Sequence, residues 1–575
     1  MRSAAPVVAA AAASALVYGY SYGISSNHAF WLPAVLERLT PGLYAGDPAV
    51  AAALRAPTLF WDLWAPLARV WGPEAAALAV WGACLLGVCA ASWSAARALG
   101  GGRRVAALAS GLAMLSPALR LSAPWAGDPL LKGFLDQTVA AWPWALWAVV
   151  HWLGGRRVRA GLLLAPAVLL NPLVGGLSAL WLAASAAIMK EGRAAAAVLA
   201  PAASAVLALW LAGRLGRADS AVLFAATPNT YAASAWPWER WLHASAWAAL
   251  WAGAVLRHPR RAELSPLLIS GMALGGLGVL AGAAPALAPL AAFQLLRLDA
   301  PLVWLGLVAA AGSAAVLLER GGSGAAAGAA GLWPLVHAFP GPVLVSWSAA
   351  LLAARTPAVR RALGMAGAAA GAAALFLPPG HPAGTAPSAA LAAMASGAAV
   401  ALSGGGWAPA LLWLAWSLTP ALPAVLAGRT LQSRELPTLA EAWARSTPSG
   451  TRFAVDPASS GFRLRSRRPV CAEWSDFNLA LYDRAATSAW RERMAGLGVD
   501  WSKVPAERAA ALLGWDRAAL NRQPSPATKG LGSWPPASLR GCAARYLVAP
   551  EGSLAWPAVF SGGGETVYEV PTGPG

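Results

Sequence analysis

Polar side chains that could do chemistry gather in residues 18–62, directly after the first apolar run of the sequence. This stretch holds Asn27, His28 and Asp47, and the glycines and prolines around Asp47 interrupt any continuous helix. A carboxylate in a loop at a membrane edge could take a proton from an acceptor or hold a divalent cation. The structural alternatives are that Asp47 forms a turn before Pro48 and that His28 only makes hydrogen bonds.

Further polar groups fall in loops that we expect on the same side of the membrane. Gln294 and Arg297 lie in an apolar stretch, LAAFQLLRL, where a phosphate partner would offset the cost of burying a guanidinium. The alternative for Arg297 is a side chain that reaches the interface and pairs with Asp299 or with lipid. Four charged residues are secondary candidates, although a turn or a local ion pair would also explain them: Asp128, Lys132, Glu239 and Arg240.

The composition indicates an α-helical polytopic membrane protein. Of the 575 residues, 58% are hydrophobic and only 12% are charged, whereas soluble domains have about 25% charged residues. Apolar runs of about 20 residues, each long enough to cross a bilayer, follow one another along most of the chain. The net charge of +18 comes mainly from arginines in short loops between these runs, which indicates membrane topology rather than nucleic-acid binding.

The distribution of basic residues predicts about 13 transmembrane helices with the N-terminus in the cytoplasm. Asn171-Pro172 breaks one apolar run whose two ends are both basic, so we expect two short helices or a re-entrant hairpin there. The predicted domains are a transmembrane domain over residues 1–430 and a small extracytoplasmic α/β domain over residues 431–575.

The C-terminal domain is predicted from a change to a charged, span-free composition beyond Gly428. Amphipathic helices are expected at residues 436–444, 479–494 and 506–513, and strands at 452–455, 546–548 and 566–570. We expect a disulfide between Cys471 and Cys542, because both lie in this domain, on the predicted oxidising side of the membrane. The arginines between residues 463 and 468 are expected on a solvated or lipid-facing surface, with acidic-glycan binding as the alternative.

Four stretches carry a resemblance to a known class of enzymes. They are SSNHAFWLPAVLERLTPGLYAGDP (25–48), ATPNTYAASAWPWERW (226–241), FQLLRL (293–298), and the pair SGFRLRSRRPV (460–470) with SAWRERM (488–494). Together with the acidic first outer loop and the outer C-terminal domain, they resemble a bacterial branch of the GT-C class of membrane glycosyltransferases. The resemblance implies a polyprenyl-phosphate-linked sugar as donor and a catalytic carboxylate in the first outer loop.

The resemblance leads us to expect a glycosyltransferase of the bacterial inner membrane that acts on the periplasmic face, with its C-terminal domain also periplasmic. Asp47 would be the base, Arg297 would bind the donor phosphate, and Gln294, Asn27 and His28 would add polar contacts. A divalent cation is an optional cofactor, with no ligand set assigned.

Two other functions remain open. A transporter or flippase of a lipid-linked intermediate needs polar groups near the midplane, for which Asn171-Pro172 is the clearest candidate. An inactive GT-C-like scaffold is favoured by Asn229-Thr230, where relatives of this type would carry a pair of histidines.

Overall fold

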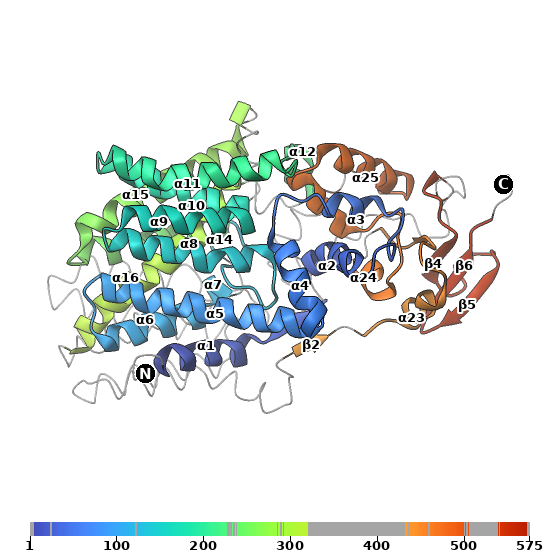
Figure 1. Cartoon of the computed structure of the whole chain (residues 1–575), viewed down its shortest axis with the longest axis horizontal. Helices are drawn as coiled ribbons and strands as arrows, with labels where there is room; N and C mark the ends of the chain where they lie inside the picture. Colours follow the sequence, from blue (N-terminus) through green and yellow to red (C-terminus); the bar gives the residue numbers. More distant parts are fainter. Residues whose placement is uncertain are drawn as a thin grey trace.

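The computed structural model describes residues 5–319 and 432–571, apart from 24–25, 121–122, 227–232, 234–235, 237, 285, 288–289, 291–292, 435, 458–459, 500, 502–503, 505–538 and 540. Long helices lie side by side in one half, and a small sheet lies at the opposite end (Figure 1). The N-terminus lies in the helical half, away from that sheet. The expected runs between residues 325 and 427, the helix at 506–513 and the Asn229-Thr230 pair lie outside the described residues.

The helical half is built from apolar helices that pack closely through alanine and glycine. Its long helices are α1 (Ala5–Tyr18), α5 (Pro73–Ala98), α6 (Arg103–Leu115), α8 (Gln137–Leu153), α9 (Arg157–Leu170), α10 (Pro172–Ile188), α11 (Gly192–Leu211), α14 (Trp238–Arg257), α15 (Arg261–Ala283) and α16 (Asp299–Glu319). Among the described residues, four helical segments are long and apolar enough to cross a membrane: Pro73–Ala98, Gly192–Leu211, Arg261–Ala283 and Leu295–Gly312. The membrane character is therefore supported, and the expected count of about 13 is not reached within the described residues.

The predicted break at Asn171-Pro172 is confirmed as the boundary between α9 and α10. Asn171 Oδ1 accepts hydrogen bonds from the backbone N–H groups of Leu173 and Val174, so the side chain caps α10. Its Nδ2 donates to Thr138 Oγ1 in the first turn of α8. Asn171 thus lies at the ends of three helices, where α9 ends and α8 and α10 begin. Both its side-chain oxygen and its side-chain nitrogen are hydrogen-bonded within the helical half.

Shorter elements form the layer between the long helices and the C-terminal end of the chain (Figure 1). They are α2 (Ser26–Leu39), α3 (Pro48–Ala53), α4 (Phe60–Trp71) and α12 (Ser220–Ala226), whereas the short α7 (Pro117–Arg120) and the 3-10 helix η3 (Leu295–Leu298) pack against the long helices. The predicted polar stretch, residues 18–62, therefore folds mostly into helices that cover one end of the bundle.

The C-terminal part is a mixed α/β unit, as predicted. Its elements are β2 (Gln432–Arg434), α23 (Leu439–Ser446), β3 (Phe453–Ala454), α24 (Phe462–Ser466), η4 (Trp474–Leu481), α25 (Arg484–Gly496), β4 (Tyr546–Pro550), β5 (Ala558–Gly562) and β6 (Glu565–Glu569). The main sheet has the order β3-β4-β6-β5, with β3 parallel to β4 and the other pairs antiparallel. The predicted disulfide joins Cys471 to Cys542.

The two parts of the chain share one hydrophobic core. Trp474 and Trp490 of the C-terminal part belong to the same cluster of buried side chains as Trp31 and Trp61, which lie in residues 18–62. The sheet and α23 enclose a second, smaller cluster. Strand β1 (Tyr20–Tyr22) pairs in parallel with β2, which joins the segment after α1 to the start of the C-terminal part.

Candidate functional site

Asp47 caps the short helix α3 from a loop that Gly46 and Pro48 shape. Its Oδ1 accepts the backbone N–H groups of Ala49 and Val50 at 3.0 and 3.2 Å. Its Oδ2 accepts Arg463 Nε at 2.7 Å and the backbone N–H of Val470 at 3.1 Å. A carboxylate offers about four acceptor positions, and these four donors fill them.

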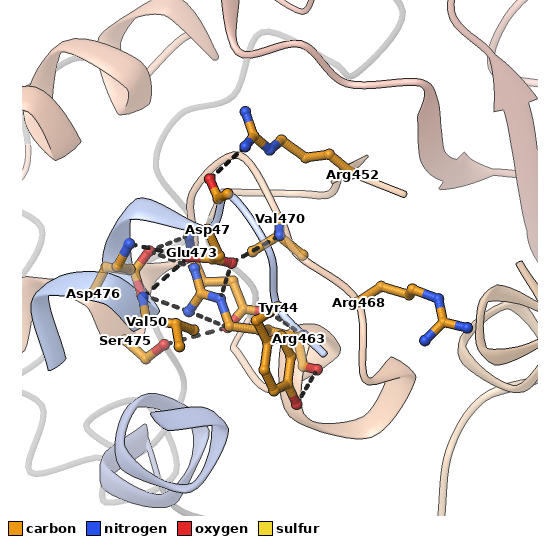
Figure 2. A network of polar contacts seen from close by, with 12 residues as sticks. Tyr44, Asp47, Val50, Arg452, Arg463, Arg468, Val470, Glu473, Ser475 and Asp476 are labelled. Atoms are coloured by element: carbon orange, nitrogen blue, oxygen red, sulfur yellow. Dashed lines mark hydrogen bonds and ion pairs between the residues drawn. The ribbon is translucent and has the colours of Figure 1, made fainter. Parts of the chain in front are cut away.

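Arg463 of α24 lies at the centre of a buried network of carboxylates (Figure 2). It forms a two-pronged pair with Asp476, Nη1 to Oδ1 at 2.7 Å and Nη2 to Oδ2 at 2.9 Å, while Nε binds Asp47. Glu473 Oε2 lies 3.5 Å from Nη1, and Glu473 also accepts the backbone N–H groups of Gly461 and Arg463. Hence one guanidinium joins residues 18–62, through Asp47, to the C-terminal part.

Arg463 faces three carboxylates in this network, and Arg493 adds a second positive charge near Asp476 and Asp47. Burial alone would lower the pKa of Arg463, but Asp47, Asp476 and Glu473 together raise it well above its usual value. Burial raises the pKa of Glu473, and Asp476 adds to this, while Arg463 and backbone N–H groups oppose the shift. The net effect is a pKa of Glu473 above its usual value.

Asp47 is only 1% exposed, and its carboxylate has no unoccupied acceptor position toward a cavity. The geometry thus assigns to Asp47 the structural role that sequence reasoning had set as the alternative. The expected role as a base receives no support from its position, because an acceptor hydroxyl would have to displace a buried ion pair.

The arginines at 463–468 also correct an expectation. Arg463 and Arg468 are buried rather than on a solvated surface, and Arg465 pairs with Glu441 of α23 at 2.8 Å. Arg468 donates to the backbone carbonyls of Arg445 and Thr447. Only Arg467 of the four is exposed. The side chains of this cluster therefore connect α24 to α23, through Glu441, and to residues 18–62, through Asp47.

A second buried network contains four of the other eight predicted site residues. Lys132 Nζ lies 2.9 Å from Asp128 Oδ1 and 2.8 Å from Asp136 Oδ2. Arg297 Nη1 lies 3.0 Å from the other oxygen of Asp128, and Asn27 Nδ2 donates to Asp136 Oδ2 at 3.1 Å. We call Asn27, Asp128, Lys132, Asp136 and Arg297 the loop network.

The loop that carries this network, residues 123–136, has little regular structure and is fastened by surrounding elements. Asp299 Oδ2 accepts the backbone N–H groups of Trp125 and Ala126, and Arg240 donates to the carbonyl of Trp125. Ser21 donates to the carbonyl of Gly133. Such fastening holds the carboxylates of an irregular loop in fixed positions.

Exposure changes along the loop network. The side chains of Asp128 and Arg297 are 18% and 19% exposed, whereas those of Lys132 and Asp136 are 7% and 1% exposed. Burial would raise the pKa of Asp128, but Arg297 and Lys132 outweigh it and lower the pKa below its usual value. Burial would lower the pKa of Lys132, and its two aspartates raise it instead. Asp128 and Lys132 therefore stabilise each other's charged form, and Asp128 with Arg297 is the accessible end of the network.

His28 supports this loop as a neutral side chain. The backbone N–H of Gly23 donates to Nδ1 at 3.0 Å, so the ring proton must be on Nε2, which lies 2.7 Å from the carbonyl oxygen of Leu135. Burial lowers the pKa of His28 to about 4, although the carbonyl of Leu135 opposes this shift. The structure therefore favours the hydrogen-bonding role for His28.

Gln294 precedes η3 in a left-handed backbone conformation, with φ of 51°. Its side chain is buried, and neither its amide nitrogen nor its amide oxygen has a hydrogen-bond partner in the described part of the chain. A buried unsatisfied amide is costly, which is consistent with a group that awaits a ligand. Glu239 lies in α14, and its side chain is outside the described residues.

The structure therefore brings Asn27, Asp128, Lys132 and Arg297 together and leaves Asp47 in the other network. The sequence places Asp136 in the same polar loop as Asp128 and Lys132, but sequence reasoning did not select it as a site residue.

Within the described residues, no group of three His, Cys, Asp or Glu side chains is arranged to hold a metal ion. No family model matches the chain, and no curated protein sequence matches it.

Proposed function

We propose that this protein is a membrane glycosyltransferase that uses a polyprenyl-phosphate-linked sugar, and that its reaction centre is the accessible end of the loop network. The proposal retains the enzyme class that the GT-C-like sequence stretches imply and moves the base from Asp47 to Asp128. The observation that carries it is the Asp128–Arg297 pair, a carboxylate beside a guanidinium at the partly exposed end of a buried charge network.

The chemistry requires these two groups side by side. Asp128 would accept the proton of the acceptor hydroxyl as its oxygen bonds to the anomeric carbon of the donor sugar. The bond between that carbon and the phosphate oxygen breaks, and the electron pair leaves with polyprenyl phosphate. Arg297 would bind the departing phosphate, and Gln294 would offer its unpartnered amide to the same substrate. Arg297 and Lys132 lower the pKa of Asp128, so Asp128 becomes a stronger base only when the donor phosphate draws Arg297 away from it.

The cost of the network supports a functional role. Four charged side chains taken largely out of water stabilise a fold weakly at best, because desolvation offsets most of their attraction. The loop network lies at the start of α8, where Asp136 is the N-cap residue, and outside the apolar length of that helix.

The test separates binding from transfer in the full-length protein. We expect Arg297→Gln to weaken binding of undecaprenyl phosphate about tenfold, since a hydrogen bond to a charged group is lost. Asp128→Asn should retain that binding and lower transfer from a panel of isotope-labelled undecaprenyl-phosphate sugars by about 100-fold or more. Native mass spectrometry measures the binding, and chromatography of the released lipid measures the transfer.

Arg55→Gln is the matched control. Arg55 is an exposed arginine of residues 18–62, and among the described residues it pairs with Asp483 and a nearby carbonyl. It should leave both measurements unchanged. Full transfer activity in Asp128→Asn, or equal loss of binding in the two arginine variants, would rule out the proposed centre.

A scaffold without transferase activity is the second candidate, and one observation favours it. Asp47, the carboxylate that the GT-C resemblance points to, is occupied in holding two parts of the chain together. If no labelled donor is turned over and Arg297→Gln leaves lipid binding intact, the scaffold should replace the enzyme. The transporter hypothesis relied mainly on Asn171 as a substrate-binding group, and Asn171 instead caps α10.

A further inference from the structure

A cavity of about 370 Å³ opens where three turns of the helical half meet. It is lined by residues from the α8–α9 turn, from the end of α10 and from the α14–α15 turn, among them Trp152, Met189, Arg157 and Arg260. This volume is within the range of small-ligand sites. The cavity shares no residue with the loop network, so it is a separate site.

Two arginines of the cavity are bound to carboxylates that remain accessible to water. Arg157 lies over the ring of Trp152, with its guanidinium carbon 4.0 Å from the ring centre, and pairs with Glu191 at 3.1 Å. Arg260 pairs with Glu263. The side chains of Glu191 and Glu263 are 43% and 42% exposed, and ion pairs this exposed contribute little free energy. A phosphate group can therefore replace either carboxylate at low cost.

The surroundings of the cavity favour an anion. Helices α9 and α15 begin at its edge without a side-chain cap, whereas α8 and α10 end there, so the helix dipoles oppose one another and the side chains set the local charge. The same three turns carry additional basic residues that outnumber Glu191 and Glu263: Arg156, Arg159, Lys190, Arg193 and Arg261. The positive potential there thus exceeds what the two carboxylates cancel.

The cavity is also partly apolar. Leu153, Met189 and the ring of Trp152 form part of its wall, next to helices that are apolar enough to lie in a bilayer. A phosphate beside an apolar wall matches a phospholipid with a net negative head group, since its phosphodiester would meet the arginines and its acyl chains the apolar side chains. We propose that this cavity binds one anionic phospholipid of the adjacent leaflet.

The experiment uses the full chain in neutral detergent and titrates phosphatidylglycerol, phosphatidylcholine and inorganic phosphate, with binding measured by native mass spectrometry. We expect saturable binding of phosphatidylglycerol and about fivefold weaker binding in Arg157→Gln. Glu191→Gln should instead strengthen binding, because it removes the carboxylate that competes for Arg157. A purely structural ion pair would not give that gain.

Arg159→Gln is the control, because it removes the same charge from an exposed position of the same helix, outside the cavity. It should change binding less than Arg157→Gln does. Equal losses in the two variants, or equal affinity for phosphatidylcholine, would overturn the proposal. Phosphate that binds while phosphatidylglycerol does not would also overturn it, in favour of a soluble phosphate ligand.

Discussion

At the scale of single residues, Arg463 decides what Asp47 does. Its guanidinium binds Asp47 and Asp476 from the middle of a buried network, and it is 1% exposed. An arginine in this position is a fixed part of the fold, because its partners are charged, buried and directed at it by backbone N–H groups. The role of Asp47 is therefore set by a side chain 416 positions further along the chain.

We expect Arg463→Met to destabilise the protein strongly, by about 3–5 kcal/mol, because it leaves buried carboxylates without their counter-ion. Thermal unfolding of the purified protein in detergent measures the effect. Arg467→Met is the matched control, since Arg467 is exposed, and its unfolding temperature should stay near that of the wild type. Similar unfolding temperatures for the two variants would mean that the network does not hold the parts together.

Glu473 should make stability depend on pH. Its pKa is raised in the folded protein by burial and by Asp476, against the opposing effect of Arg463, so the folded state binds its proton more tightly than the unfolded state does. The stabilisation is then fully present below the ordinary glutamate pKa of about 4.3 and is lost as the pH rises through the higher folded value.

Glu473→Gln, which cannot lose a proton, should flatten this dependence. Unfolding temperatures measured across that pH range, for the wild type and for Glu473→Gln, test the expectation. A wild type whose stability rises with pH in the same range, relative to the variant, would contradict it.

At the scale of elements, small residues determine how closely the helices of the bundle pack. A Cβ atom added at Gly161 of α9 would lie 1.9 Å from the carbonyl oxygen of Ala197 in α11, whereas one added at Gly176 of α10 would meet nothing within 4 Å. The composition predicted close helix packing, but only the packed helices show which glycine is required for it.

This difference gives a matched pair of variants. Gly176→Ala should stabilise the protein by up to about 1 kcal/mol, because alanine is the better helix former. Gly161→Ala should destabilise it by about 1–3 kcal/mol, because α9 and α11 must move apart. Thermal unfolding of both variants checks the sign of each change, and an increase in stability for both would show that α9 and α11 are not packed this closely.

At the scale of the whole molecule, the N-terminus and the C-terminal sheet lie at opposite ends of the helical half (Figure 1). The turn between α5 and α6 follows Arg97 and precedes Arg103, and α5 runs toward that turn from the end where α4 lies. Basic residues at one end of a bundle indicate its cytoplasmic side. Because the C-terminal part lies at the opposite end, we expect it on the periplasmic side.

A C-terminal alkaline phosphatase fusion should therefore be active, and a C-terminal green fluorescent protein fusion should be dark. Fusions after Gly101 in the α5–α6 turn serve as the control and should give the reverse pattern. If the C-terminal fusions behaved like those after Gly101, the sidedness of every site described above would be reversed.

The sequence by itself determined the apolar helical character of the chain, the helix break at Asn171-Pro172, the Cys471–Cys542 pairing and three strands of the C-terminal part, β3, β4 and β6, but not β2 or β5. These features depend on local composition, on proline geometry or on a small number of possible partners. The sequence also singled out the charged residues that could do chemistry.

Only the tertiary structure decided which of these charges meet. Asp47 and Asp128 have nearly the same neighbours in sequence, Ala-Gly before and Pro after, so local chemistry gives both the same turn-forming preference. Long-range packing gives Asp47 four buried donors and leaves Asp128 at the accessible end of the loop network with Arg297. The difference comes from Arg463, which is 416 residues from Asp47, and from Arg297, which is 169 residues from Asp128. Electrostatic interactions depend on distance in space, and the local sequence does not show which distant residues come close.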